Sequence, residues 1–114
     1  MMDLKDRTLK YAIDVRKFAR SVYKDKLNQD DFNQLIRSSG SVGANFIEAV
    51  ESLSKKDYMY RLRVCLKECK ESRYWLIVIK NTNQIVNQHD LDILTEESME
   101  LIKILSSIIH KQKQ

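Results

Sequence analysis

The sequence predicts an all-α protein, an antiparallel up-down-up-down four-helix bundle, and three observations indicate this fold class. The chain of 114 residues contains no proline and 32% of its residues are charged, which favours long helices over turns and strands. Apolar residues recur at helical spacing along most of the chain. Short polar breaks separate segments of similar length, which places consecutive helices antiparallel. We therefore expect one domain, residues 1–114, with helices at about 3–26, 31–53, 55–80 and 88–110.

The first predicted helix carries one apolar stripe, with members three or four residues apart. These members are Leu4, Thr8, Tyr11, Ala12, Val15, Phe18, Ala19 and Val22. A polar break at 28–30 follows, and Asp30 or Asp31 can cap the second helix.

The second predicted helix contains the most informative segment of the chain, residues 37–49. Both glycines, Gly40 and Gly43, lie in it among several serines, a composition that usually marks a loop. Apolar positions nevertheless continue through it at helical spacing, from Phe32 to Val50. We therefore expect a helix that gives up ~1 kcal/mol of propensity per glycine so that another backbone can approach closely.

A narrow polar stripe is expected on the same helix, formed by Ser41, Asn45 and Glu48. Buried polar groups are tolerated only when they are hydrogen-bonded, so each member needs a partner. We expect the Glu48 carboxylate to be partly sheltered and bonded to a neighbouring helix. Candidate donors are Arg61, Arg73 and Tyr74.

The third predicted helix opens with a capping box, because Asp57 follows Ser54 at the required spacing, and the fourth begins near Gln88 or Asp90. Both helices spread apolar residues beyond the stripe of roughly 100° that one buried face needs. Examples are Val64, Trp75 and Val78 on the third helix and Ile93, Ile102 and Ile104 on the fourth. This surplus predicts a homo-oligomer; the alternative is a monomer with a somewhat apolar surface.

Charge is distributed unevenly along the chain. The net charge is only +4, but the first and third predicted helices are basic and the second and fourth are acidic. Cations follow one side of each basic helix. They are Arg16, Arg20 and Lys24 on the first, and Lys56, Arg63, Lys67 and Lys70 on the third. Such stripes suit a phosphate backbone, which rewards several cations along its length. The alternative is an ordinary solvated surface, with some cations paired to Glu68 or Asp14.

The sequence offers little for catalysis, a metal or a cofactor, and we expect none of them. Neither histidine has the Glu-x-x-His spacing of di-iron bundles. Cys65 and Cys69 lack the two further ligands that a zinc ion would need, so we expect them to be buried free thiols. A catalytic site at Asn45 and Glu48 is the least favoured alternative. Tyr74 and Trp75 could stack on bases, although a core or interface role is favoured for the tryptophan.

Localisation is expected to be cytoplasmic, with no membrane partner. No apolar run is long enough to cross a bilayer, and residues 1–5 lack the apolar core of a signal peptide. Two cysteines without an export signal are consistent with reduced thiols.

Three segments in a fixed order, residues 41–49, 54–58 and 66–76, resemble the bacterial four-helix-bundle proteins known as 23S ribosomal RNA intervening-sequence proteins. The resemblance implies a ring-shaped homopentamer with a central pore. It also implies kinship to the accessory proteins of diversity-generating retroelements, basic pentamers that bind nucleic acid and a reverse transcriptase. It gives a structural role to the motif residues Ser41, Gly43, Asn45, Glu48, Glu68 and Glu71.

Two functions remain in competition. The leading hypothesis is a non-enzymatic module that binds RNA or DNA, most plausibly RNA, through basic stripes repeated around the ring. The alternative is a protein-interaction scaffold, in which the acidic second and fourth helices or the ring rim dock a partner such as a polymerase or reverse transcriptase.

Overall fold

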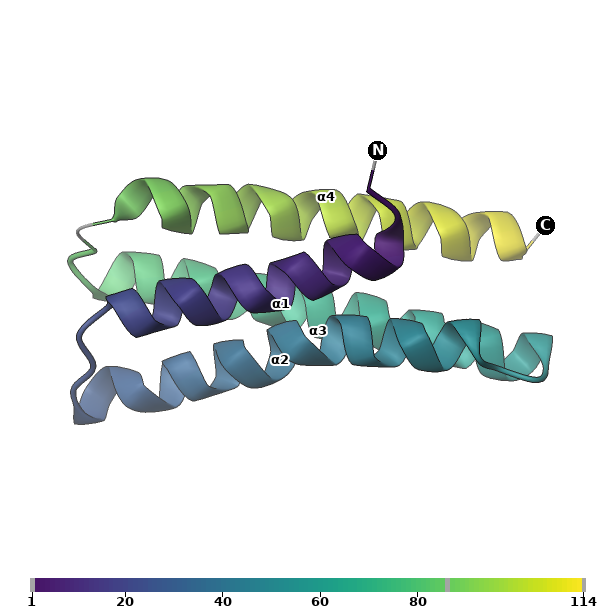
Figure 1. The fold of residues 1–114 in the computed structure, drawn as a ribbon, viewed down its shortest axis with the longest axis horizontal. Helices are drawn as coiled ribbons and strands as arrows, with labels where there is room; N and C mark the ends of the chain where they lie inside the picture. Colours follow the sequence, from purple (N-terminus) through teal and green to yellow (C-terminus); the bar gives the residue numbers. More distant parts are fainter. Residues whose placement is uncertain (1, 86, 114) are drawn as a thin grey trace.

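The computed structural model describes residues 2–85 and 87–113, and within them it contains four helices and no strand. The helices are α1 (Leu4–Ser21), α2 (Lys26–Val50), α3 (Lys55–Thr82) and α4 (Gln88–Gln112). Consecutive helices run in opposite directions, as Figure 1 shows. Over the described residues, the predicted all-α four-helix arrangement is therefore confirmed.

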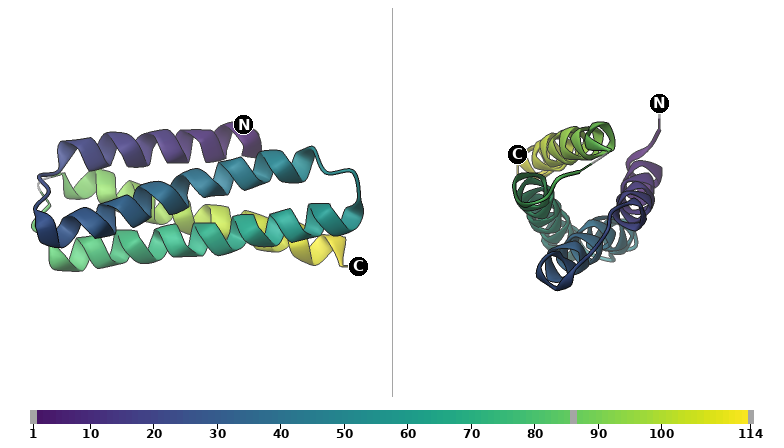
Figure 2. Two further views of the ribbon diagram at one scale, coloured as in Figure 1. Left: turned by 90° about the horizontal axis from the view of Figure 1, so that it is seen from below. Right: turned by 90° about the vertical axis from the view of Figure 1, so that its left-hand side faces the viewer.

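The four helices are arranged roughly as a square in cross-section. Each packs against its neighbours in sequence, and α1 also packs against α4. The end-on view in Figure 2 places α1 and α3 at opposite corners of this square. One core lies at the centre and receives fully buried side chains from every helix, including Val15, Phe32, Leu62 and Leu101.

The first connection differs from the prediction. α1 ends at Ser21 and α2 already begins at Lys26, so the break covers residues 22–25 and not 28–30. The reason is a capping box at Asp25, whose carboxylate accepts hydrogen bonds from the backbone N–H groups of Leu27 and Asn28. The Asn28 side chain in turn accepts from the Asp25 N–H at 2.8 Å, which makes Asn28 part of the helix start.

α2 ends at Val50, three residues before the predicted end at 53, and the boundaries of α3 and α4 are closer to the prediction. Ser54 caps α3 by accepting a hydrogen bond from the Asp57 N–H at 3.1 Å, which is one of the two hydrogen bonds of the predicted capping box. α3 ends at Thr82 and α4 spans Gln88–Gln112, each within two residues of its predicted bounds.

α2 continues without interruption through Gly40 and Gly43, which confirms that the small-residue segment is helical. Neither glycine has a positive φ, so neither is required by the backbone conformation. Gly43 instead faces α1, where a Cβ would lie 3.1 Å from the Thr8 Oγ1 and 3.5 Å from the Thr8 carbonyl carbon. The predicted close approach of a second backbone therefore occurs at Gly43.

α1 is the shortest helix, with 18 residues against 25 to 28 in the others. At 1.5 Å per residue it is shorter by about 10–15 Å. Figure 1 shows the start of α1 lying well short of the α2–α3 connection. Near that connection Ile47, Val50 and Leu53 are 49%, 59% and 100% exposed.

Most of the surplus apolar residues expected on α3 and α4 are half-buried, namely Val64, Trp75, Val78, Ile102 and Ile104, whereas Ile93 is 49% exposed. Additional large apolar side chains are exposed on other elements. These include Leu9 and Ile13 on α1 and Ile47 and Val50 on α2. Over the described residues, no helix is long and apolar enough to cross a membrane.

Candidate nucleic-acid interface

The outer side of α3 presents six exposed side chains in a single line. They recur at a spacing of three or four residues, which keeps them on one helix face. We call this line the α3 stripe; it consists of Lys56, Tyr60, Arg63, Lys67, Lys70 and Tyr74. Its 18-residue span corresponds to about 27 Å along the helix axis.

The acidic residues between these cations are directed away from the stripe. Arg37 on α2 lies 3.2 Å from the Glu68 Oε2 and also forms an ion pair with Glu71. The Glu68 side chain is only 12% exposed as a result. The hydrogen bond from Arg37 lowers the pKa of Glu71, which keeps that carboxylate ionised beside its partner.

The four stripe cations, by contrast, remain exposed to solvent. Within residues 2–85 and 87–113, none of Lys56, Arg63, Lys67 and Lys70 forms an ion pair. Asp57 is the one acidic residue of α3 that is exposed in the described structure, and it lies at the first turn. The solvent side of α3 is therefore cationic over most of its length.

The three cations predicted on α1 do not form a comparable free surface. The Arg16 guanidinium lies across α2 and donates to the carbonyl oxygens of Ala12 and Ile36 at 3.1 and 3.2 Å. Of the three, only Arg20 is exposed; Arg16 and Lys24 are half-buried. Arg16 lies against α2 because Gly40 leaves space there: a Cβ on Gly40 would be 2.9 Å from the Arg16 Nη2.

Lys24 is also engaged within the chain. Its Nζ donates to the carbonyl oxygens of Ala19 and Val22 at the end of α1 and lies 5.0 Å from the centroid of the Phe32 ring. A cation at a helix C-terminus satisfies carbonyl groups that have no intrahelical partner. Moreover, α1 and α3 occupy opposite corners of the bundle, so their cations cannot form one surface on a single chain.

The polar stripe on α2 is only partly as expected. Asn45 accepts a hydrogen bond from the Arg61 Nη1 at 3.1 Å and donates to the Ser41 carbonyl oxygen at 2.8 Å. Ser41 and Asn45 are half-buried at the α2–α3 seam.

The expectation of a sheltered Glu48 was wrong, because its side chain is exposed. The antiparallel register explains why two of the expected donors are out of reach. Asn45 stands opposite Arg61, so Arg73 and Tyr74 lie further along α3 by about 18 Å. Arg61, the third expected donor, is bonded to Asn45.

Both cysteines are free and buried, as predicted. Burial raises the pKa of Cys65 and of Cys69 to about 12, so neither is a thiolate near neutral pH. The described part of the chain contains no group of three or more histidine, cysteine or acidic side chains placed to hold a metal.

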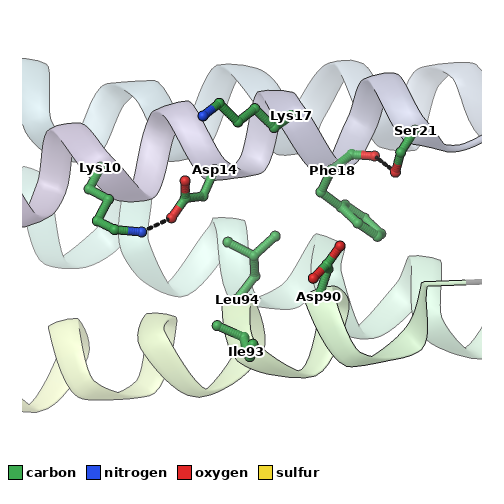
Figure 3. Close-up of a pocket in the computed structure, with 8 residues that line it drawn as sticks. All are labelled: Lys10, Asp14, Lys17, Phe18, Ser21, Asp90, Ile93 and Leu94. Atoms are coloured by element: carbon green, nitrogen blue, oxygen red, sulfur yellow. Dashed lines mark hydrogen bonds and ion pairs between the residues drawn. The ribbon is translucent and has the colours of Figure 1, made fainter.

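A groove follows the seam between α1 and α4 (Figure 3). Its main pocket has a volume of about 350 Å³ and an apolar lining from Phe18, Ile93 and Leu94. In Figure 3 the Lys10–Asp14 ion pair runs along the α1 rim. An adjoining pocket of about 300 Å³ extends the groove, and its α4 wall includes Glu96, Glu97 and Glu100.

Sequence reasoning missed Tyr60, which lies four residues after Lys56 and three before Arg63 on the same helix face. That spacing alone was sufficient to place Tyr60 in the stripe. As a base-stacking residue, Tyr74 was considered together with Trp75, but the two differ: Tyr74 is 59% exposed, whereas Trp75 is half-buried.

Comparison with known proteins identifies the family. The sequence profile of the 23S rRNA-intervening sequence proteins matches residues 2–107. The chain belongs to this family. A solved structure from Bacteroides thetaiotaomicron, described as a protein of unknown function from the S23 ribosomal protein family, is 30% identical to the chain and superimposes with a TM-score of 0.84. That match covers 94% of this chain and 98% of the other. The comparison with curated proteins finds no match.

Proposed function

We propose that this member of the family is a non-enzymatic nucleic-acid-binding module of the cytoplasm that contacts RNA through the cations of the α3 stripe. The observation that supports it is the separation of charge on α3. Four exposed cations follow one side of the helix, while Glu68 and Glu71 are held against Arg37 on α2. The family's description, which refers to an intervening sequence of 23S rRNA, favours RNA over DNA.

The expected binding is electrostatic and largely independent of sequence. Phosphate contacts fix the position of a protein on a nucleic acid but do not read its bases. Each such contact on a single strand adds a slope of about −0.7 to the dependence of log affinity on log salt concentration. A complex that uses all four stripe cations should therefore weaken steeply between about 50 and 200 mM salt.

The experiment compares two double variants that remove the same charge. Lys67→Gln with Lys70→Gln alters the centre of the stripe, whereas Lys111→Gln with Lys113→Gln alters exposed lysines at the end of α4. The first should reduce the salt slope by about 1.4 and weaken all RNA sequences to a similar extent. The second should leave the slope close to that of the parent protein. Absence of measurable affinity for RNA or DNA at low salt would overturn the proposal.

A protein-interaction scaffold is the second candidate, and the α1–α4 groove is the observation that favours it. The groove combines an apolar lining with acidic residues on its α4 wall, which suits a basic, amphipathic segment of a partner such as a polymerase. Within the chain, Glu97 is paired with Arg7 and Glu100 with Lys103, so such a segment would have to compete with these ion pairs. Co-purification distinguishes the two candidates. Bound nucleic acid supports the first, and one stoichiometric protein supports the second.

Assembly into a homopentameric ring is part of the same proposal, because each copy would repeat the α3 stripe. Exposed apolar side chains where α1 leaves α2 uncovered, among them Ile47, Val50 and Leu53, supply surface that a second chain can bury. Sedimentation equilibrium should give five times the chain mass of 13.5 kDa. A monomer at micromolar concentration would overturn the ring.

A further inference from the structure

Two tyrosines occupy the α3 stripe, and both are largely exposed. Tyr60 and Tyr74 each expose 59% of their surface. Aromatic side chains normally contribute to stability by burial, and exposed ones in a line with cations are characteristic of surfaces that bind another molecule. From this placement we infer that the α3 stripe takes single-stranded nucleic acid, with Tyr60 and Tyr74 stacking on unpaired bases. This inference rests on the proposed function and specifies its ligand.

The order of residues along the stripe supports the assignment. Three cations, at positions 63, 67 and 70, lie between the two tyrosines, which are 14 residues or about 21 Å apart. Proteins that bind single strands combine cations that follow the backbone with aromatic rings on which bases stack. The bases of a duplex are stacked on one another, so a duplex offers the cations its phosphates but offers the tyrosines no free base.

Each tyrosine is supported on one side by a neighbour that is itself anchored. The Arg61 guanidinium lies 5.6 Å from the centroid of the Tyr60 ring and is bonded to Asn45 on α2. The arrangement limits the freedom of the Tyr60 ring before a ligand arrives, which reduces the entropy lost on binding.

Tyr74, at the C-terminal end of the stripe, is supported by an aromatic neighbour instead of a cation. The rings of Tyr74 and Trp75 meet edge to face, with centroids 5.0 Å apart and planes at 83°. The Trp75 Nε1 donates to the Glu71 carboxylate at 3.3 Å, and Glu71 is held by Arg37. Tyr60 and Tyr74 are therefore both oriented rings whose surface remains more than half exposed.

A second copy of the chain is the competing occupant, since exposed tyrosines are also common in protein interfaces. The charge between the tyrosines favours nucleic acid. Arg63, Lys67 and Lys70 would need acidic partners in such an interface, whereas a strand of phosphates supplies a negative charge at every nucleotide.

The experiment measures the affinity of the full chain for a uridine oligomer of about twelve nucleotides and for an RNA duplex of the same length. Tyr60→Leu and Tyr74→Leu retain an apolar side chain and remove the ring. Tyr23→Leu is the matched control, because Tyr23 is 84% exposed in the α1–α2 connection. Each stripe variant should weaken binding of the oligomer by about 5- to 150-fold and leave duplex binding and the salt slope unchanged.

Replacement by phenylalanine at the same two positions should restore oligomer binding, because phenylalanine preserves the stacking face. Equal losses for oligomer and duplex, or no loss for either, would overturn the stacking inference and leave the nucleic-acid proposal intact. No affinity of the parent protein for either probe would instead overturn the proposed function itself. A change in sedimentation mass in the leucine variants would assign the tyrosines to an interface between copies.

Discussion

A single methyl group added at Gly43 should destabilise the fold, although alanine is the better helix former. In the interior of a helix, replacing glycine by alanine gains about 1 kcal/mol of propensity. At this position the new Cβ would lie 3.1 Å from the Thr8 Oγ1. Thr8 is 1% exposed, and its hydroxyl donates to the carbonyl oxygens of Leu4 and Lys5, so it cannot easily move away.

The magnitude follows from these opposing effects. Overpacking a rigid contact costs about 1–3 kcal/mol, so Gly43→Ala should lower the free energy of unfolding by up to about 2 kcal/mol after the gain in propensity. Gly43→Leu adds three further carbons against the same backbone and should cost more. Urea denaturation, followed by circular dichroism at fixed protein concentration, should give the alanine variant a midpoint roughly 1 M lower than that of the parent protein.

Two controls make the test specific. Gly40→Ala adds the same methyl group one turn earlier, where the nearest atom is the Arg16 Nη2 at the end of a flexible side chain. That variant should be neutral or stabilised by up to about 1 kcal/mol. In a Thr8→Ala background, where the tight contact is gone, Gly43→Ala should also stabilise. Equal stabilisation by Gly43→Ala in both backgrounds would refute the assignment of Gly43 to a close helix contact.

Three further outcomes are expected. Arg37→Gln should lower stability at neutral pH by less than about 1 kcal/mol, because the Arg37 ion pairs are partly exposed. Arg37 lowers the pKa of Glu71 from its ordinary 4.5, so the pair stabilises the fold above that pH, and this contribution is lost as the pH falls through the lower folded value. Urea midpoints measured across the acid range should therefore depend less on pH in the variant than in the parent. Asp25→Ala should cost about 1 kcal/mol in the same assay, since it removes the α2 cap; an unchanged midpoint would contradict the capping role. Cys65 and Cys69 should resist a thiol reagent at mildly alkaline pH in the folded protein and react in concentrated urea, because burial raises the pKa of both thiols to about 12; rapid labelling of the folded chain would show that the core opens.

Local patterns were sufficient to predict most of the fold. The helical spacing of apolar residues continues through Gly40 and Gly43, and the structure confirms both the helix and the contact that the glycines permit. The start of α2 was missed because its cap combines Asp25 with an asparagine at the third position. That asparagine, Asn28, is held by a distant partner: its amide donates to the Asn83 Oδ1 at 2.9 Å. Sequence spacing does not reveal such a partner.

The candidate interface was predictable where it depends on one helix and not where it depends on two. Lys56, Arg63, Lys67 and Lys70 share a face by spacing alone, and all are exposed. Arg16 donates a hydrogen bond to α2, and Lys24 donates to carbonyl oxygens at the end of α1. These contacts depend on how the elements pack in space, which residue spacing along one helix does not show. The burial of Glu48 was predicted wrongly for the same reason, since the α2–α3 register decides which residues lie beside it.

The short α1 also has a consequence for the dynamics of the bundle. α2 and α3 pack along the greatest length, whereas α1 and α4 meet over the least, with the groove between them. Local opening should therefore begin with α1, and its backbone amides should exchange with solvent before those of α3. The α3 stripe is carried by the helix pair that opens last. Its spacing of cations and rings should thus persist through fluctuations that detach the first helix.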